Sequence, residues 1–151
     1  MTCTTLLLLL YDRATCINGQ ANDGWTQGIM IAALLGQTKQ AKTMVVQRGH
    51  TTPAVGYRFP AFAPANQDYE PSADHYANQN MAIQWMLLQP ADDVNSSMIL
   101  FGAWPCDWDV DFKLHGPLNT VVMGTLTNGT LVHLEVEPKE RRKDVINMLQ
   151  C

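Results

Sequence analysis

The chain has 151 residues, of which 46% are hydrophobic and 16% are charged, and its formal net charge is −4. This composition permits one globular domain, or parts of two, and lacks the charge-rich signature of disorder. The only basic cluster spans residues 139–143, so the chain lacks the positive surface that nucleic acid requires. We therefore expect no nucleic-acid partner.

An apolar run over residues 6–10 lies near the start of the chain. It differs from a signal peptide because no basic region precedes it and because it ends at Tyr11, Asp12 and Arg13. It is also too short to cross a bilayer. We therefore predict the buried start of a helix inherited from a longer chain, and no membrane partner.

The four cysteines of the chain are widely scattered: Cys3, Cys16, Cys106 and Cys151. They form no CxxC pair and have no spacing typical of metal ligands. We expect them to act as small hydrophobic residues, and their spacing supports no disulfide.

Two adjacent segments have the pattern of short helices. Residues 27–35 are mostly apolar, and Gly36 after them offers the left-handed conformation that ends helices. A second helix is predicted over residues 38–49, with Thr38 as its cap and apolar residues at helical spacing. Such a hairpin cannot bury both of its own faces, so we expect it to belong to a larger helical array.

Residues 50–73 lose all periodicity, because four prolines interrupt any helix. The segment carries the aromatic residues Tyr57, Phe59, Phe62 and Tyr69. Long loops in compact domains are usually functional or else indicate a misread element, and aromatic-rich loops also line sugar-binding clefts. Packing alone would explain the rings as well, but we favour the functional interpretation.

A buried helix is predicted to begin at Asp74 and to continue through the apolar residues 81–88. A helix that is apolar on all sides must be enclosed by other elements. At the N-terminus of this helix, unpaired N–H groups and the helix dipole would favour the charged form of Asp74. That position suits an ordinary N-cap, which is the commoner case, or a functional carboxylate near Asp68 and Glu70.

After Pro90 the periodicity changes from helical to alternating. Residues 98–101 form a short apolar run, and in residues 109–115 polar side chains alternate with Val110, Phe112 and Leu114, as in a half-buried strand. Asn128-Gly129 is a strong hairpin signal, because both residues tolerate the positive φ of a tight turn. We predict that it joins strands over residues 120–127 and 130–137.

In the second strand of this hairpin, we expect Val132, Leu134 and Val136 to face inward and His133, Glu135 and Glu137 to face solvent. Residues 145–149 are a further candidate strand. Helices followed by strands predict an α+β fold, divided near Pro90 into parts 1–90 and 91–151.

Asp107, Asp109 and Asp111 alternate as at the start of an EF-hand loop. Phe112, however, stands where the sharp turn needs Gly, and Leu118 where the loop needs Glu, so we interpret the acids as an outward strand face. The four histidines have no metal-binding spacing, and the sequence has no GxSxG, P-loop or GxGxxG motif. We predict no metal and no cofactor.

Several stretches of the chain resemble glycoside hydrolase family 95-like proteins. They are residues 24–25 and 32–36, 74–89 with 98–105, and 107–115 with 141–145. The first pair is similar to a late hairpin of the family's (α/α)6 barrel, the second to its last barrel helix and following strand, and the third to its closing β-domain. The resemblance implies terminal helices of a truncated (α/α)6 barrel, followed by a small antiparallel β-sandwich-like C-terminal domain.

The family includes inverting α-L-fucosidases, which use a Glu as general acid and an Asp, assisted by two Asn side chains, as general base. The resemblance implies that Asp74 is the base and that His75, Tyr69 and Phe62 contribute to substrate binding. Those enzymes have Gly-Asn-Phe-Gly where this chain has His75-Tyr-Ala-Asn78. The acid and the Asn pair would lie upstream of this chain, so we expect a C-terminal fragment that is inactive alone.

The partners implied by the resemblance are a fucosylated or related glycan and the N-terminal part of the parent protein, which would be extracellular or periplasmic. Two other interpretations remain open. The β-portion, with the aromatic loop above it, would serve as a non-catalytic carbohydrate-binding or interaction module. The chain would otherwise be a gene remnant with no function of its own.

Overall fold

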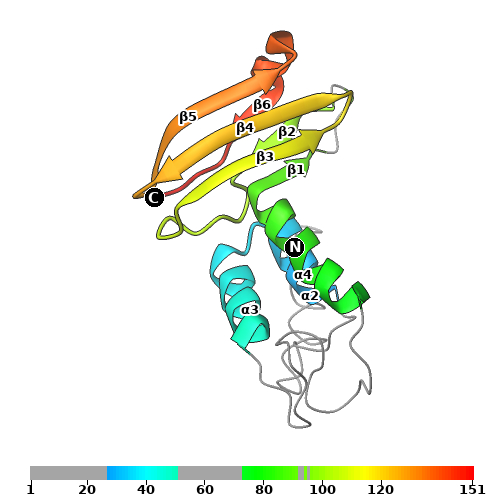
Figure 1. The fold of residues 1–151 in the computed structure, drawn as a ribbon, viewed down its shortest axis with the longest axis vertical. Coiled ribbons are helices and arrows are strands. Elements are labelled where there is room, and N and C mark those ends of the chain that lie inside the picture. Colours follow the sequence, from blue (N-terminus) through cyan, green and yellow to red (C-terminus); the bar gives the residue numbers. More distant parts are fainter. Residues whose placement is uncertain (1–26, 51–72, 92–93, 95) are drawn as a thin grey trace, which may run out of the picture.

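The computed structural model of the chain describes residues 27–50, 73–91, 94 and 96–151 (Figure 1). Our expectations for residues 6–10 and 24–25, for Cys3 and Cys16, and for the aromatic loop with Phe62 and Tyr69 lie outside the described residues.

The described elements are helices followed by strands. In chain order they are α2 (Gly28–Leu34), α3 (Thr38–His50), α4 (Ala73–Leu87), β1 (Leu88–Pro90), β2 (Met98–Leu100), β3 (Val110–Gly116), β4 (Thr120–Thr127), β5 (Thr130–Glu137), the 3₁₀-helix η1 (Lys139–Asp144) and β6 (Val145–Asn147). The fold class is therefore α+β. Within the described residues, no helix is both long enough and apolar enough to span a membrane.

The predicted helical hairpin is confirmed as α2 and α3. Gly36 has a φ of +68°, its N–H donates to Ala33 O at 3.0 Å, and the N–H of Gln37 donates to Ala32 O at 2.9 Å. This hydrogen-bond pair is the Schellman ending, in which a left-handed glycine satisfies the last carbonyls of a helix. The glycine therefore ends α2 for the reason that its position in the sequence suggests.

Among the described helices, α4 packs against α2 and, less extensively, against α3 (Figure 1). Ala82 and Met86 are fully buried, whereas Met81 is 43% exposed and Trp85 is half-buried. The expectation that residues 81–88 form a helix enclosed on all sides is therefore wrong. Helical periodicity ends at Leu87, because Leu88 begins strand β1 and takes its hydrogen bonds from the sheet.

The strands form two three-stranded sheets (Figure 1). In the first, β2 lies between β1, which is antiparallel to it, and β6, which is parallel to it. In the second, β4 lies between β3 and β5, and all three strands are antiparallel. Both sheets contribute to the hydrophobic core, whose fully buried members include Met98, Leu100, Val122 and Leu126.

The Asn128-Gly129 hairpin is confirmed, with φ of 50° and 70° at its two turn residues. The predicted inward position of Val132 is wrong, since this side chain is 61% exposed. Leu126 pairs with Leu131 while Thr125 pairs with His133, so Val132 is the extra residue of a β-bulge. A bulge shifts the alternation by one residue, which turns Val132 outward and Leu131 inward.

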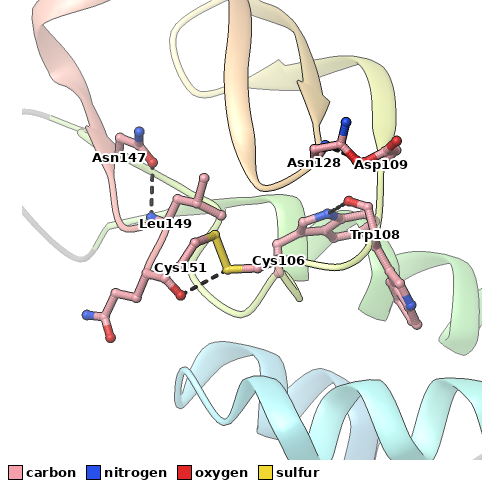
Figure 2. The surroundings of a disulfide bond; sticks show 9 residues. Cys106, Trp108, Asp109, Asn128, Asn147, Leu149 and Cys151 are labelled. Carbon is pink, nitrogen blue, oxygen red and sulfur yellow. Dashed lines mark hydrogen bonds between the residues drawn. A yellow bond between two sulfur atoms is a disulfide. The ribbon is translucent and has the colours of Figure 1, made fainter.

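A disulfide joins Cys106 to Cys151, whose Cα atoms lie 5.6 Å apart (Figure 2). The expectation that the cysteines are unpaired hydrophobic residues is therefore wrong for these two. They are separated by 45 residues, and the parallel pairing of β6 with β2 brings them together. Cys106 Sγ also lies 3.0 Å from Gln150 O, a close contact rather than a hydrogen bond, since a disulfide sulfur carries no proton.

Candidate functional site

The residues predicted to form the site are only partly described. Asp74 and His75 lie in the first turn of α4, which begins at Ala73, so Asp74 is inside the helix and not its N-cap. Phe62 and Tyr69 lie outside the described residues. The structure therefore gives the helical positions of Asp74 and His75, and the expected grouping of all four residues lies outside the described residues.

The position of Asp74 on the helix relates it to residues further along α4. Residues separated by seven and eleven positions fall on nearly the same face of an α-helix, so position 74 shares a face with Met81 and Trp85. The buried face of α4, which includes Ala82 and Met86, packs toward α2. Position 74 therefore belongs to the face that Met81 leaves partly exposed.

At its other end, α4 is held firmly to the first sheet. The backbone N–H of Phe101 donates to Leu87 O at 2.6 Å, and that of Ala103 donates to Met86 O at 3.2 Å. The side chain of Gln89, only 4% exposed, donates from Nε2 to Ala33 O at 2.7 Å. These bonds satisfy backbone carbonyls at the helix ends and connect helix, strand and corner into one unit.

The corner after β2 is tied to α3 as well. The rings of Trp104 and Trp108 meet edge to face, with centroids 5.5 Å apart, and Trp104 Nε1 donates to Trp108 O at 2.9 Å. Lys42 forms a salt bridge with Asp107 and lies 5.7 Å from the centroid of the Trp108 ring. The hydrogen bond from Lys42 lowers the pKa of Asp107 below its ordinary value of 3.8.

A cavity of about 170 Å³ opens at the junction of α4 with the two sheets. It is lined by Gln84, Trp85, Leu88, Gln89, Pro90, Leu114, His115, Gly116 and Pro117. None of these described residues is Asp, Glu, Lys or Arg, and His115 is the one among them whose side chain can carry a charge. The chemistry of the lining is that of an indole wall with amide groups and one imidazole.

The sequence does not reveal this cavity, because Trp85 lies in the apolar segment 81–88, whose composition predicts a buried helix. The signal that was available is Gln84, the single polar residue within that segment. Gln84 is exposed, and Trp85 beside it is only half-buried.

The outward face of the second sheet is polar. Asp111, Thr125 and His133 form one row across β3, β4 and β5, and Thr125 Oγ1 donates to Asp111 Oδ1 at 2.5 Å. Asp109 Oδ1 accepts from the N–H of Asn128 at 2.8 Å (Figure 2). No Phe, Tyr or Trp occupies an outward-facing position on these three described strands. The face therefore has no aromatic platform.

These acids do not assemble into an ion site. Asp107, Asp109 and Asp111 are exposed and each has a hydrogen-bond donor from the protein, which agrees with the predicted solvent-facing acids. Within the part of the chain that the structure describes, no group of three or more His, Cys, Asp or Glu side chains is arranged to hold a metal ion.

Comparisons of the chain with protein-family models, with curated proteins and with solved structures gave no significant match.

Proposed function

We propose that the chain is the C-terminal part of a glycoside hydrolase that resembles the inverting α-L-fucosidases, with Asp74 at the position of the base that activates water. The observation that carries this proposal is the contact between the two stretches on which the resemblance depends. Residues 74–89 and 98–105 meet through the bonds from Phe101 to Leu87 and from Ala103 to Met86. The helix and the Trp-Pro corner thus form one unit, as the end of a barrel and its following domain would.

The finer architecture belongs to the same proposal. Leu34, Val46 and Met81, one on each described helix, are 47%, 38% and 43% exposed. A complete ring of barrel helices would bury apolar side chains of this kind. On the β side, the edge-to-face contact between Phe101 and Phe112, with centroids 5.8 Å apart, supports a sandwich-like packing of the two sheets.

The position of Asp74 in the first turn of α4 suits a general base. A helix N-terminus favours the ionised form of a carboxylate, and a base must be ionised to take a proton from water. Inverting hydrolysis also needs a protonated carboxylic acid on the other side of the glycosidic bond, with the two carboxyl groups roughly 6.5–9.5 Å apart. Under the proposal that acid belongs to the upstream part of the parent, so this chain alone releases no sugar.

The disulfide between Cys106 and Cys151 supports an exported parent. Disulfides persist in extracellular and periplasmic compartments, whereas cytosolic thiols are kept reduced.

A chimera tests the proposal. Residues 73–151 of this chain would replace the corresponding end of a family 95 α-L-fucosidase, and hydrolysis of a fucosylated oligosaccharide would be followed by NMR. We expect release of L-fucose with inversion, and Asp74→Asn should lower kcat by about 10²- to 10⁴-fold, the range of general-base catalysis. Asp109→Asn is the matched control, since an Asn oxygen still accepts the hydrogen bond from Asn128.

Two results would contradict the proposal. The first is a chimera that unfolds cooperatively but releases no fucose. The second is an Asp74→Asn chimera as active as its parent. The isolated chain should be inactive in the same assay, and measurable release of fucose by it would show that it does not depend on an upstream acid.

A further inference from the structure

We infer that the cavity at the junction of α4 and the two sheets binds one neutral sugar unit, at a place separate from Asp74. The choice of a sugar as ligand rests on the proposed function, but the location rests on the cavity alone. Trp85 is eleven residues from Asp74 along α4, so a rise of 1.5 Å per residue separates the two positions by about 16 Å.

The cavity has the size and rigidity of a binding site for a single small ring. Its volume is about 170 Å³, below the usual range for drug-sized ligands. Its walls include Pro90 and Pro117, whose backbones have restricted φ, and Gly116, where an added Cβ would meet Met98 Sδ. Gln89 is held in place by its hydrogen bond to α2. A ligand would therefore enter a site that is already formed.

The lining specifies a neutral ligand that carries hydroxyl groups. Trp85 lines the cavity and is only partly buried, and an indole ring suits the apolar face of a pyranose. Gln89 donates from Nε2 to Ala33 O, which fixes the orientation of its amide. Gln84 adds an exposed amide that can both donate and accept. A cationic ligand would find no Asp or Glu in the lining, and an anionic ligand would find the imidazole of His115 but no Lys or Arg, so the lining compensates the desolvation of a charged ligand poorly.

The cavity also lies at the end of the helix face that includes position 74. Trp85 lines the cavity and shares that face with Met81 and position 74. A glycan that extended along the exposed side of α4 from the proposed catalytic position would reach the cavity. The inference is therefore a second sugar subsite on the same helix face.

The test uses the 151-residue chain labelled with 5-fluorotryptophan, with the Trp85 signal assigned by its loss in Trp85→Leu. L-Fucose, D-galactose and D-glucose would be titrated while the ¹⁹F spectrum is recorded. From the efficiency typical of ligands, a monosaccharide should bind with a Kd on the order of 1 mM. We expect at least one of the three sugars to shift the Trp85 signal saturably in this range.

Two variants and a charged probe make the test specific. Gln84→Ala should weaken binding about 3- to 10-fold by removing one hydrogen bond, whereas Asn80→Ala, an exposed amide one turn earlier that does not line the cavity, should not. D-Glucuronate has the ring of D-glucose and a carboxylate, and should bind at least about 10-fold more weakly than D-glucose because the lining offers its charge no Lys or Arg.

No saturable shift with any neutral sugar at about ten times the expected Kd would overturn the inference, and so would equal binding by Gln84→Ala and the unaltered chain. Glucuronate binding as tight as that of the neutral sugars would overturn it as well. Failure here alongside an active chimera would reject only the second subsite. An inactive chimera alongside a sugar-dependent Trp85 signal would reject only the catalytic proposal.

Discussion

The disulfide between Cys106 and Cys151 should be a large contribution to the stability of the β-portion. Cys151→Ser opens a loop whose ends are 45 residues apart in sequence. In the chain-entropy model, closing a loop of this length removes about 13 cal/mol/K from the unfolded chain, which is about 4 kcal/mol at 25 °C. This value is an upper bound, because residual structure in the denatured chain reduces the entropy lost. We expect the free energy of unfolding to fall by about 2–4 kcal/mol.

Urea denaturation followed by circular dichroism measures this change, with the midpoint and slope compared between the two proteins. The control is the same measurement in the presence of a reductant that opens the disulfide. With dithiothreitol present in both samples, the unaltered chain should have the same stability as Cys151→Ser. A difference below about 1 kcal/mol would refute the reasoning, since even a strained bridge over a loop of this length should exceed it. Free thiols at both positions in the oxidised protein, detected by alkylation and mass spectrometry, would also refute it.

Three other changes test the packing and the ion pair. Gly124→Ala should lower stability by about 1–3 kcal/mol in thermal melts, because a Cβ there would lie 2.8 Å from Phe112 Cζ; an unchanged Tm would contradict this. Gln89→Ala should cost about 1–3 kcal/mol in urea unfolding, since it removes the buried hydrogen bond to α2. Lys42→Met should raise the pKa of Asp107 toward 3.8 in an NMR titration. Because that pKa is lowered in the folded state, the pair stabilises the fold above pH 3.8, and the two proteins should converge in stability as pH falls through the folded-state pKa.

The second sheet was the most predictable part of the fold, because residues close together in the sequence specify its strands and its turn. Alternation over residues 109–115 and the Asn128-Gly129 turn set the strands and the register near the turn. The bulge at Val132 was not predictable, since alternation within one strand does not reveal an extra residue opposite its partner. The residues Leu131, Val132 and His133 fit either alternation of inward and outward side chains until the pairing with β4 is known.

Features that depend on residues far apart in the sequence could not be predicted from the sequence pattern. The resemblance predicts a helix over residues 74–89, whereas α4 ends at Leu87, because apolar residues suit a buried helix and a buried strand alike. What ends it is the pairing of β1 with β2, ten residues later in the chain. The bridge between Cys106 and Cys151 likewise depends on the return of β6 to β2, and cysteine spacing carries no record of that pairing.

The candidate site divides in the same way. Asp74 and His75 were selected by resemblance, and the structure adds only their helical positions in the first turn of α4. The cavity beside Trp85 could not be selected from the sequence, because it forms where β3 meets the end of α4. Only Gln84, a polar residue in an apolar segment, marked that face of the helix as open.

Helix α4 connects the proposed catalytic position, Asp74, with the inferred sugar subsite at the junction of α4 and the two sheets. Its first turn carries Asp74, and its last turn is bonded to the corner through Leu87 and runs into Gln89. Because a single helix connects the two ends, their spacing along the axis is set by helix geometry, whereas the orientation of the sheet depends on the bonds at the junction. Gln89 both bonds to α2 and lines the cavity, so loosening it would change the shape of the cavity before it altered the first turn of α4. Under the inferred sugar subsite, packing and recognition at the junction would therefore depend on the same side chain.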